Sequence, residues 1–202
     1  RAVTLQPNFL EAQGNLGSAL EQLGRHAEAL DCYRHALQLN PGIPELRYNV
    51  GNVLQTLGRH EEAEQSYREA VRLRPAYVEA HDHLGVVAAK QDRHDEAIAH
   101  YRRALAIRPD HAASHYNLAM SLKHLDRLDE AVASYRRTLV INPRDTDAHV
   151  NLGVALVEQQ KIDEAIACYR EALRLKPDDA DAYNNLGVAL VEQQKIDEAI
   201  AC

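Results

Sequence analysis

The side chains in this chain that are best suited to molecular recognition are asparagines that recur at one fixed spacing. The series is Asn15, Asn49, Asn117, Asn151 and Asn185, and His83 stands where a sixth Asn would fall. Each carboxamide offers one acceptor and two donors on a short stem. A row of such groups can bind the N–H and C=O of an extended peptide, whatever side chains the peptide carries. The alternative is that each Asn bonds neighbouring backbone, and the sequence leaves both interpretations open.

Two further series share this spacing. Three residues after each asparagine position the chain becomes apolar towards its C-terminus, with Ser18 and Asn52 followed by Val86, Met120, Val154 and Val188. Apolar side chains of a bound peptide could pack there, although ordinary helix packing explains these residues equally well. The second series is acidic and consists of Glu11, Glu45, Glu79, Asp147 and Asp181, with Ala113 interrupting it. Acidic residues complement a helix N-terminus, and they would also make the rim of a groove negative.

Motifs for catalysis and for metal binding are weak by comparison. We find no Gly-rich phosphate loop, nucleophile elbow or zinc-hydrolase motif, so we expect no enzymatic activity and no cofactor. His81 and His83 are two residues apart, and His111 and His115 are four apart, a spacing that can place two rings on one helical face. However, His81, His115 and His149 occupy one repeated position, which indicates packing. We therefore expect no metal site.

The elements that position these residues follow from a strict repeat. Six prolines lie 34 residues apart, at Pro7, Pro41, Pro75, Pro109, Pro143 and Pro177. A fixed period of this length is typical of a repeat array. Each unit contains two apolar stripes of helical period, separated by a short polar break such as Gly24-Arg25 or Gly58-Arg59. Glycine suits the C-terminal cap of the first helix, and the proline ends the second helix.

The repeat divides the chain without insertions or deletions. We predict five complete units, at residues 10–43, 44–77, 78–111, 112–145 and 146–179, in one continuous array over 1–202. Residues 1–9 form the tail of a preceding unit, and residues 180–202 form a partial unit. Because each unit holds two helices, the predicted fold class is all-α, a solenoid of antiparallel helix pairs.

The repeated columns resemble the tetratricopeptide repeat family over essentially the whole chain. The first helix carries the pairs Leu16-Gly17, Val50-Gly51, Leu84-Gly85, Leu152-Gly153 and Leu186-Gly187. The second helix carries Ala, Tyr and Ala, as in Ala29, Tyr33 and Ala36. The resemblance implies a right-handed superhelix whose first helices line a concave groove. In that setting the asparagine series resembles the asparagine ladder of O-linked N-acetylglucosamine transferases, which hold substrate peptides in this way.

Two units depart from the family pattern. The fourth unit has Ala119 in place of Gly and Thr138 in place of Ala, and the third has Ala88 in place of the large residue of the first helix. We expect these two units to pack less tightly or to bend the array.

Composition excludes several classes of partner. The net charge is −7 and the pI is about 5.9, unlike the basic footprint of a nucleic-acid binder. No apolar run approaches the roughly 18 residues needed to cross a bilayer. Cys32, Cys168 and Cys202 share one repeat position, which is typical of small buried thiols in a reducing compartment. We therefore expect a cytoplasmic protein that binds neither nucleic acid nor membrane.

The sequence therefore predicts a non-catalytic scaffold that binds an extended peptide or a partner protein, preferably neutral or basic, in its groove. One alternative is a substrate-recruiting domain of a larger enzyme, such as a bacterial glycosyltransferase of the O-linked N-acetylglucosamine type. Another is a self-associating structural or engineered array, because residues 151–168 recur verbatim as residues 185–202. Neither end carries the polar cap usual for such arrays, so we also expect head-to-tail self-association.

Overall fold

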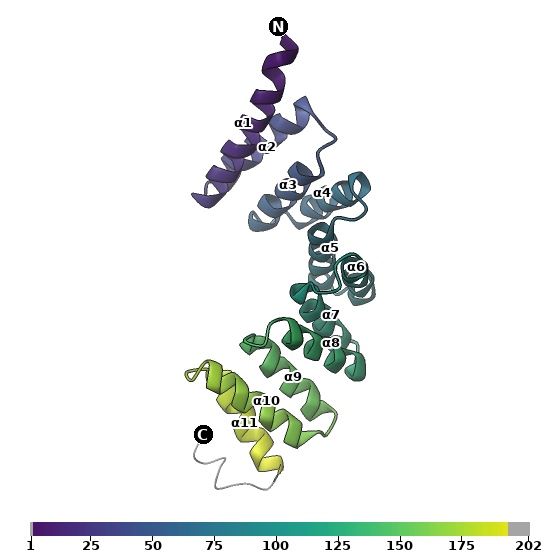
Figure 1. The fold of residues 1–202 in the computed structure, drawn as a ribbon, viewed down its shortest axis with the longest axis vertical. Coiled ribbons are helices and arrows are strands. Elements are labelled where there is room, and N and C mark those ends of the chain that lie inside the picture. Colours follow the sequence, from purple (N-terminus) through teal and green to yellow (C-terminus); the bar gives the residue numbers. More distant parts are fainter. Residues whose placement is uncertain (1, 194–202) are drawn as a thin grey trace. The chain divides into compact units, whose positions relative to one another are not determined.

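A computed structural model describes the backbone of residues 2–193 and the side chains of residues 9–193. Over this range the chain forms eleven helices and no strand (Figure 1). Their bounds are α1 (Ala2–Gln22), α2 (His26–Leu39), α3 (Pro44–Thr56), α4 (His60–Leu73), α5 (Val78–Lys90), α6 (His94–Ile107), α7 (Ala112–His124), α8 (Leu128–Ile141), α9 (Thr146–Glu158), α10 (Ile162–Leu175) and α11 (Ala180–Glu192). The predicted all-α class is confirmed. None of these helices is both long and apolar enough to serve as a membrane span.

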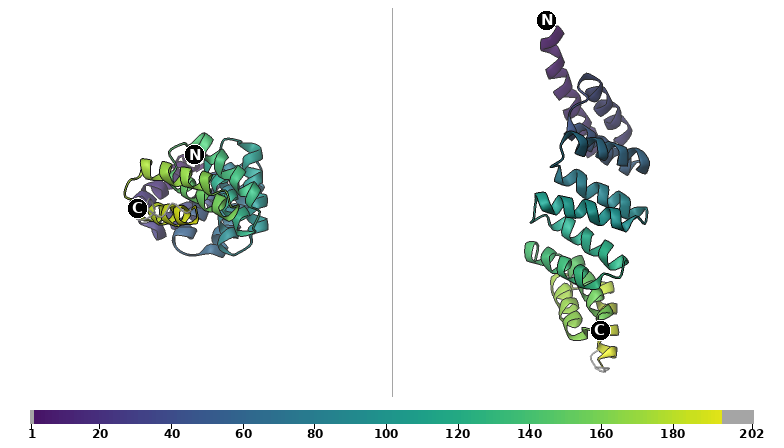
Figure 2. Two further views of the ribbon diagram at one scale, coloured as in Figure 1. Left: turned by 90° about the horizontal axis from the view of Figure 1, so that it is seen from below. Right: turned by 90° about the vertical axis from the view of Figure 1, so that its right-hand side faces the viewer.

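The helices form two compact units, residues 1–87 and 88–202, and each unit is described by itself. In both, consecutive helices pair in antiparallel fashion, and the second helix of a pair packs against the first helix of the next pair. Figure 2 shows this arrangement for α6 to α9, drawn in teal and green, which lie side by side. Each unit has its own apolar core, which contains Tyr33 and Tyr67 in the first and Tyr135 and Tyr169 in the second.

Packing inside a helix pair depends on the absence of a side chain at the Leu-Gly position. A Cβ added to Gly17 would lie 2.6 Å from the Tyr33 ring, and one added to Gly51 would lie 2.5 Å from the Tyr67 ring. Real Cβ atoms do not approach other atoms so closely, so the tyrosine ring occupies the space that glycine leaves. The Ala series of the second helices, Ala29, Ala63, Ala97, Ala131 and Ala165, is fully buried for the same reason.

The break between the two helices of a pair is a left-handed cap. The backbone φ is positive at Gly24, Gly58, Asp92, Asp126 and Gln160, which all occupy one repeat position. In the first pair, Arg25 N–H donates to Leu20 C=O over 2.8 Å, and Gly24 N–H donates to Glu21 C=O. These bonds satisfy carbonyl groups that the end of the helix leaves open. The predicted glycine caps at residues 24 and 58 are thus present in the structure.

One predicted boundary is wrong. The first proline, Pro7, lies inside α1, and no new helix begins at Leu10. The later prolines of the repeat series lie in turns between two helices, as Pro41 does between α2 and α3. In that turn Gly42 N–H donates to the Asn40 side chain over 3.0 Å. Glu11 lies in the middle of α1 rather than in the first turn of a helix.

Candidate functional site

In residues 88–202 the structure places the predicted asparagines on three first helices. Asn117 on α7, Asn151 on α9 and Asn185 on α11 are all half-buried, and we call them the amide row. Residues three positions apart on a helix share a face, so the apolar series lies beside the amide row. We call Met120, Val154 and Val188 the apolar row. Met120 is 47% exposed and Val188 is 52% exposed, whereas Val154 is half-buried.

One member of the amide row already makes contacts within the protein. Asn151 Nδ2 donates to the Tyr116 hydroxyl over 2.9 Å and to the backbone carbonyl of Asp147 over 3.0 Å. The second contact is the neighbouring-backbone bond that the alternative interpretation of the series expects. Both contacts use the amide nitrogen, and the amide oxygen takes part in neither. Asn151 is therefore oriented by α7 and by its own helix.

Residues 1–87 carry a cluster of aromatic rings that we call the aromatic patch, formed by Tyr48, Tyr67, Tyr77 and His83. The Tyr48 ring centroid lies 5.8 Å from that of Tyr67, 5.2 Å from that of Tyr77 and 5.3 Å from that of His83. Such separations are typical of favourable aromatic pairs. Burial raises the pKa of Tyr77 to about 12, so its hydroxyl stays protonated at neutral pH. In the patch Tyr48, Tyr77 and His83 are half-buried, whereas Tyr67 is fully buried beneath them.

Hydrogen bonds hold the aromatic patch together. The Tyr67 hydroxyl lies 2.8 Å from Asn52 Oδ1 and 2.9 Å from Gln55 Oε1, so these two acceptors share its proton. His83 Nε2 lies 3.1 Å from the Tyr48 hydroxyl, and His83 Nδ1 lies 3.3 Å from the Tyr67 hydroxyl. Both ring nitrogens of His83 therefore contact the protein. Asn52, which we expected to face a ligand, instead bonds Tyr67.

The remaining predicted residues of this unit differ in exposure. Asn15 on α1 is exposed, Asn49 on α3 is half-buried next to Tyr48, and Val86 on α5 is half-buried. They lie on separate helices, as the repeat requires.

Tyr48 and Tyr116 are contacts of the asparagine series that the sequence analysis missed. They lie 68 residues apart at equivalent positions, where the other units carry Gly14, Asp82, Val150 and Asn184. Each contacts the asparagine-series residue 35 positions further along the chain, which is His83 for Tyr48 and Asn151 for Tyr116. A search for similarity at two repeat lengths would have detected the pair.

Tyr135 presents a buried hydroxyl without a hydrogen-bond partner in the described part of the chain. Its counterpart Tyr67 bonds Asn52 and Gln55, but the fourth unit has Met120 and Lys123 at those positions. Burial raises the pKa of Tyr135, so the hydroxyl stays protonated. The Tyr135 ring meets the Tyr116 ring edge to face, with centroids 5.8 Å apart. An unpaired donor therefore lies directly beside the residue that orients Asn151.

Most residues of the acidic series lie in the first turns of helices, where a negative charge complements the helix dipole. Glu45, Glu79, Asp147 and Asp181 occupy the first turns of α3, α5, α9 and α11. Glu45 forms an ion pair with Arg74, whose guanidinium lies 5.0 Å from the centroid of the Tyr77 ring. The negative charge of Glu45 is thus compensated locally. Asp147 and Asp181 are exposed beside the amide row.

The repeated histidines serve packing. The Nε2 atoms of His81, His115 and His149 lie 3.0–3.1 Å from the carbonyl oxygen of the loop proline six residues earlier. Because a carbonyl only accepts, each ring must donate from Nε2 and remains fixed to the loop. Burial lowers the pKa of His115, which favours the neutral ring. These contacts agree with the packing interpretation of the series.

A cavity of about 250 Å³ in residues 1–87 lies apart from the predicted site. It is lined by residues of α2, α3 and α4, including Arg34, Arg47 and Glu69, and by none of the predicted site residues.

Comparisons with known proteins agree with this architecture. A family model described as the Cilia and flagella-associated protein 70 C-terminal domain matches residues 2–187, and a Tetratricopeptide repeat model matches residues 180–202. The chain therefore belongs to the tetratricopeptide repeat family. No curated protein matches it.

Solved structures show the same fold. Pseudomonas aeruginosa pilF is 19% identical, with a TM-score of 0.84 over 97% of this chain and 89% of that one. MamA is 24% identical, with a TM-score of 0.76 over 86% and 95% of the two chains. YrrB, described as a TPR protein with an unusual peptide-binding site, is 23% identical, with a TM-score of 0.73 over 85% and 89%. At these identities the likeness concerns the fold alone.

Proposed function

We propose that this chain is a non-catalytic protein-interaction scaffold that binds an extended peptide segment. The observation that carries the proposal is the amide row of α7, α9 and α11, which lies beside the partly exposed apolar row. The peptide-binding site in the description of YrrB supports the same class of function.

The amide row is suited to reading a peptide backbone. The Asn151 amide oxygen is oriented through the contacts of its nitrogen with Tyr116 and Asp147, so it is an acceptor for a peptide N–H. A pre-oriented group loses less conformational freedom on binding than a mobile one. The partly exposed side chains of Met120 and Val188 would then contact apolar side chains of the peptide.

The spacing of the row sets the length of its ligand. Packed helices lie about 8–10 Å apart, and an extended chain advances about 3.3 Å per residue. One spacing therefore corresponds to about three peptide residues, and the two spacings between the three members of the row to about six. We propose a neutral or basic segment, because Asp147 and Asp181 are exposed beside the row.

The test uses a phage-displayed library of random ten-residue peptides. Peptides selected on the full chain are measured by fluorescence anisotropy against the wild type and against the double variant Asn117→Ala, Asn151→Ala. A net 0.5–1.5 kcal/mol per hydrogen bond predicts about ten-fold weaker binding or more for the two substitutions together. Asn151→Ala also removes the bonds to Tyr116 and Asp147, so we expect a modest loss of thermal stability beside the larger loss of affinity.

Asn142→Ala is the matched control, because Asn142 is an exposed asparagine at the C-terminal end of α8, outside the row. It should leave affinity unchanged. If the double variant loses stability and keeps its affinity, the asparagines serve packing and the proposed peptide site is wrong.

The two alternatives from the sequence make other predictions. A substrate-recruiting domain would be joined to a catalytic domain in its full-length protein, which the complete gene would reveal. A self-associating array would assemble without any peptide, and its mass by light scattering would rise with concentration. The second half of the verbatim copy, residues 194–202 with Cys202, lies outside the described residues.

A further inference from the structure

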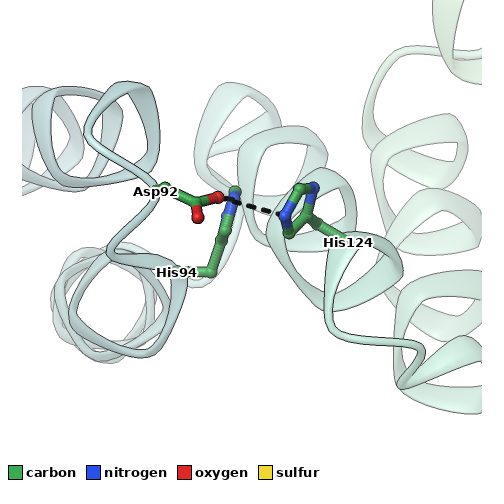
Figure 3. Close-up of side chains that lie close together, drawn as sticks. All are labelled: Asp92, His94 and His124. Atoms are coloured by element: carbon green, nitrogen blue, oxygen red, sulfur yellow. Dashed lines mark ion pairs between the residues drawn. The ribbon is translucent and has the colours of Figure 1, made fainter.

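Two histidines and one aspartate converge at the junction of the third and fourth helix pairs (Figure 3). Asp92 lies in the turn between α5 and α6, His94 is the first residue of α6, and His124 is the last residue of α7. All three belong to residues 88–202. Their side chains point toward one another, and one ligand atom from each lies within 4.8 Å of the others.

The separations of the donor atoms suit a metal ion. Asp92 Oδ1 lies 3.4 Å from His94 Nε2 and 3.2 Å from His124 Nε2. In a tetrahedral zinc site the metal–ligand distances are about 2.0–2.2 Å, which places neighbouring ligand atoms about 3.3–3.6 Å apart. The aspartate oxygen therefore already lies at about the required distance from both nitrogens.

The backbone explains why the cluster forms at this junction. Asp92 occupies the left-handed cap, with φ of 60°. One pair earlier the equivalent positions hold Gly58, His60 and Lys90, and one pair later they hold Asp126, Leu128 and Glu158. Among the junctions that the structure describes, this one alone supplies a carboxylate and two imidazoles together.

The two rings differ in how firmly they are held. His94 is 12% exposed, and its Nδ1 is buried without a partner in the described part of the chain, so Nε2 is the nitrogen it offers. The His124 ring stacks on it at 3.8 Å with a 26° tilt. Because the two rings are nearly parallel, they must rotate apart before the lone pairs of both nitrogens can point at one ion. His124 is 56% exposed and can turn to allow this.

The charges around the cluster do not oppose a cation strongly. Asp92 is 83% exposed, so its carboxylate keeps most of its hydration and costs little to bring to an ion. The basic residues next to the cluster in the sequence are engaged elsewhere, since Arg93 pairs with Glu96 and Lys123 lies 3.3 Å from Glu158.

We propose that Asp92, His94 and His124 form a binding site for a divalent transition metal, best suited to Zn²⁺, with water completing the coordination. Imidazole and carboxylate donors are typical zinc ligands. The ion would join the α5–α6 turn to the end of α7 and so tie two helix pairs together. The sequence analysis expected no metal because it compared only histidines within four residues of each other in the sequence, whereas His124 lies far from Asp92 and His94 along the chain.

The test is calorimetric titration of the tag-free full chain with ZnCl₂, after its cysteines have been alkylated to exclude thiol ligands. We expect one Zn²⁺ per chain. Because the ion binds only the folded site, the unfolding midpoint should rise by about 5 °C at a hundred-fold excess over Kd. Bound Co²⁺ should show the visible absorption of tetrahedral coordination.

Exposed ligands supply variants that should fold. Asp92→Gly should fold, because glycine already occupies the equivalent left-handed cap at Gly58. His124→Gln keeps a polar side chain at the end of α7. Each should weaken Zn²⁺ binding at least ten-fold and reduce the thermal shift to about half or less at the same Zn²⁺ concentration. The matched controls Asp126→Gly and His60→Gln alter equivalent positions outside the cluster and should bind as the wild type does. The proposal would be overturned if the wild type shows no saturable binding at millimolar Zn²⁺. It would also be overturned if binding survives in both cluster variants.

Discussion

Close packing at single positions explains the most repeated residues of this chain. Gly17 and Gly51 face tyrosine rings that leave no room for a Cβ, whereas a Cβ at Gly14, on the same helix as Gly17, would lie 3.7 Å from Leu46 Cδ2, an ordinary contact distance. Ala119 occupies the Leu-Gly position in the fourth unit and is fully buried. Glycine thus has a packing role at the Leu-Gly position and none at Gly14.

This difference predicts opposite effects of the same substitution. Gly51→Ala should lower the free energy of unfolding by about 1–3 kcal/mol, because the added methyl group displaces the Tyr67 ring. Gly14→Ala should be neutral or stabilise by up to about 1 kcal/mol, because its methyl group meets only the Leu46 side chain at an ordinary contact distance and alanine is the better helix former. Urea unfolding followed by circular dichroism measures both. Equal losses in the two variants would show that the tyrosine contact is not the cause.

Function at the residue scale depends on contacts that sequence spacing alone does not reveal. The asparagine series was found from its period, but the contact of Asn151 with Tyr116 joins two helices. The same holds for Tyr48 and His83. A period identifies which residues are equivalent, and only the packing of neighbouring helices decides which of them touch.

At the scale of the element, the two kinds of helix begin differently. Asp145 caps α9 and Asp179 caps α11, each accepting a 3.0 Å hydrogen bond from a backbone N–H three residues on. Four of the second helices begin after an arginine that pairs with a glutamate three residues later, as Arg25 does with Glu28 at 2.6 Å. Exposed pairs of this kind contribute little, about 0.2–1 kcal/mol each.

The cap at Asp179 predicts a pH-dependent stability. The backbone N–H of Ala182, and then Lys176, hold the pKa of Asp179 below its usual value. A depressed folded pKa contributes stability above the unfolded pKa of about 3.9, and the contribution is lost as the pH falls through the folded pKa. Asp179→Ala should therefore lower the free energy of unfolding by about 1 kcal/mol at pH 7. Asp179→Asn should lower it by about 1 kcal/mol or less, because asparagine still caps the helix.

Thermal unfolding between pH 7 and pH 3 measures this effect. The difference between wild type and Asp179→Ala should be constant down to about pH 4 and shrink below it. Asp178→Asn, which alters the adjacent exposed aspartate, serves as the control and should shift the midpoint little at any pH. A difference that stays constant to pH 3 would show that the carboxylate charge plays no part.

At the scale of the whole molecule, the division between the two compact units falls inside α5, next to Ala88. Ala88 is fully buried where the other units carry the buried leucines Leu20, Leu54, Leu122, Leu156 and Leu190. In the fourth unit, Thr138 is buried and its hydroxyl bonds Ser134 C=O over 3.2 Å. Smaller or more polar core residues bury less apolar surface.

Stability in a repeat array is a sum of local terms, so it need not be uniform along the chain. We predict faster amide hydrogen exchange in residues 78–145 than in residues 44–77 and 146–179. Exchange measured by mass spectrometry resolves these segments. Ala88→Leu serves as the companion variant, and slower exchange in the third unit would show that the small residue is responsible. Uniform protection in the wild type would contradict the prediction.

The amino-acid sequence alone determined the helices and their order, because the apolar period, the caps and the loop prolines act within a few residues of each other. The exception is Pro7, which lies inside α1 and not at a helix end. Tertiary structure alone decided which side chains meet. Asp92 and His124, or Tyr48 and His83, come together only when helices from successive units pack against one another, and no local pattern encodes that contact.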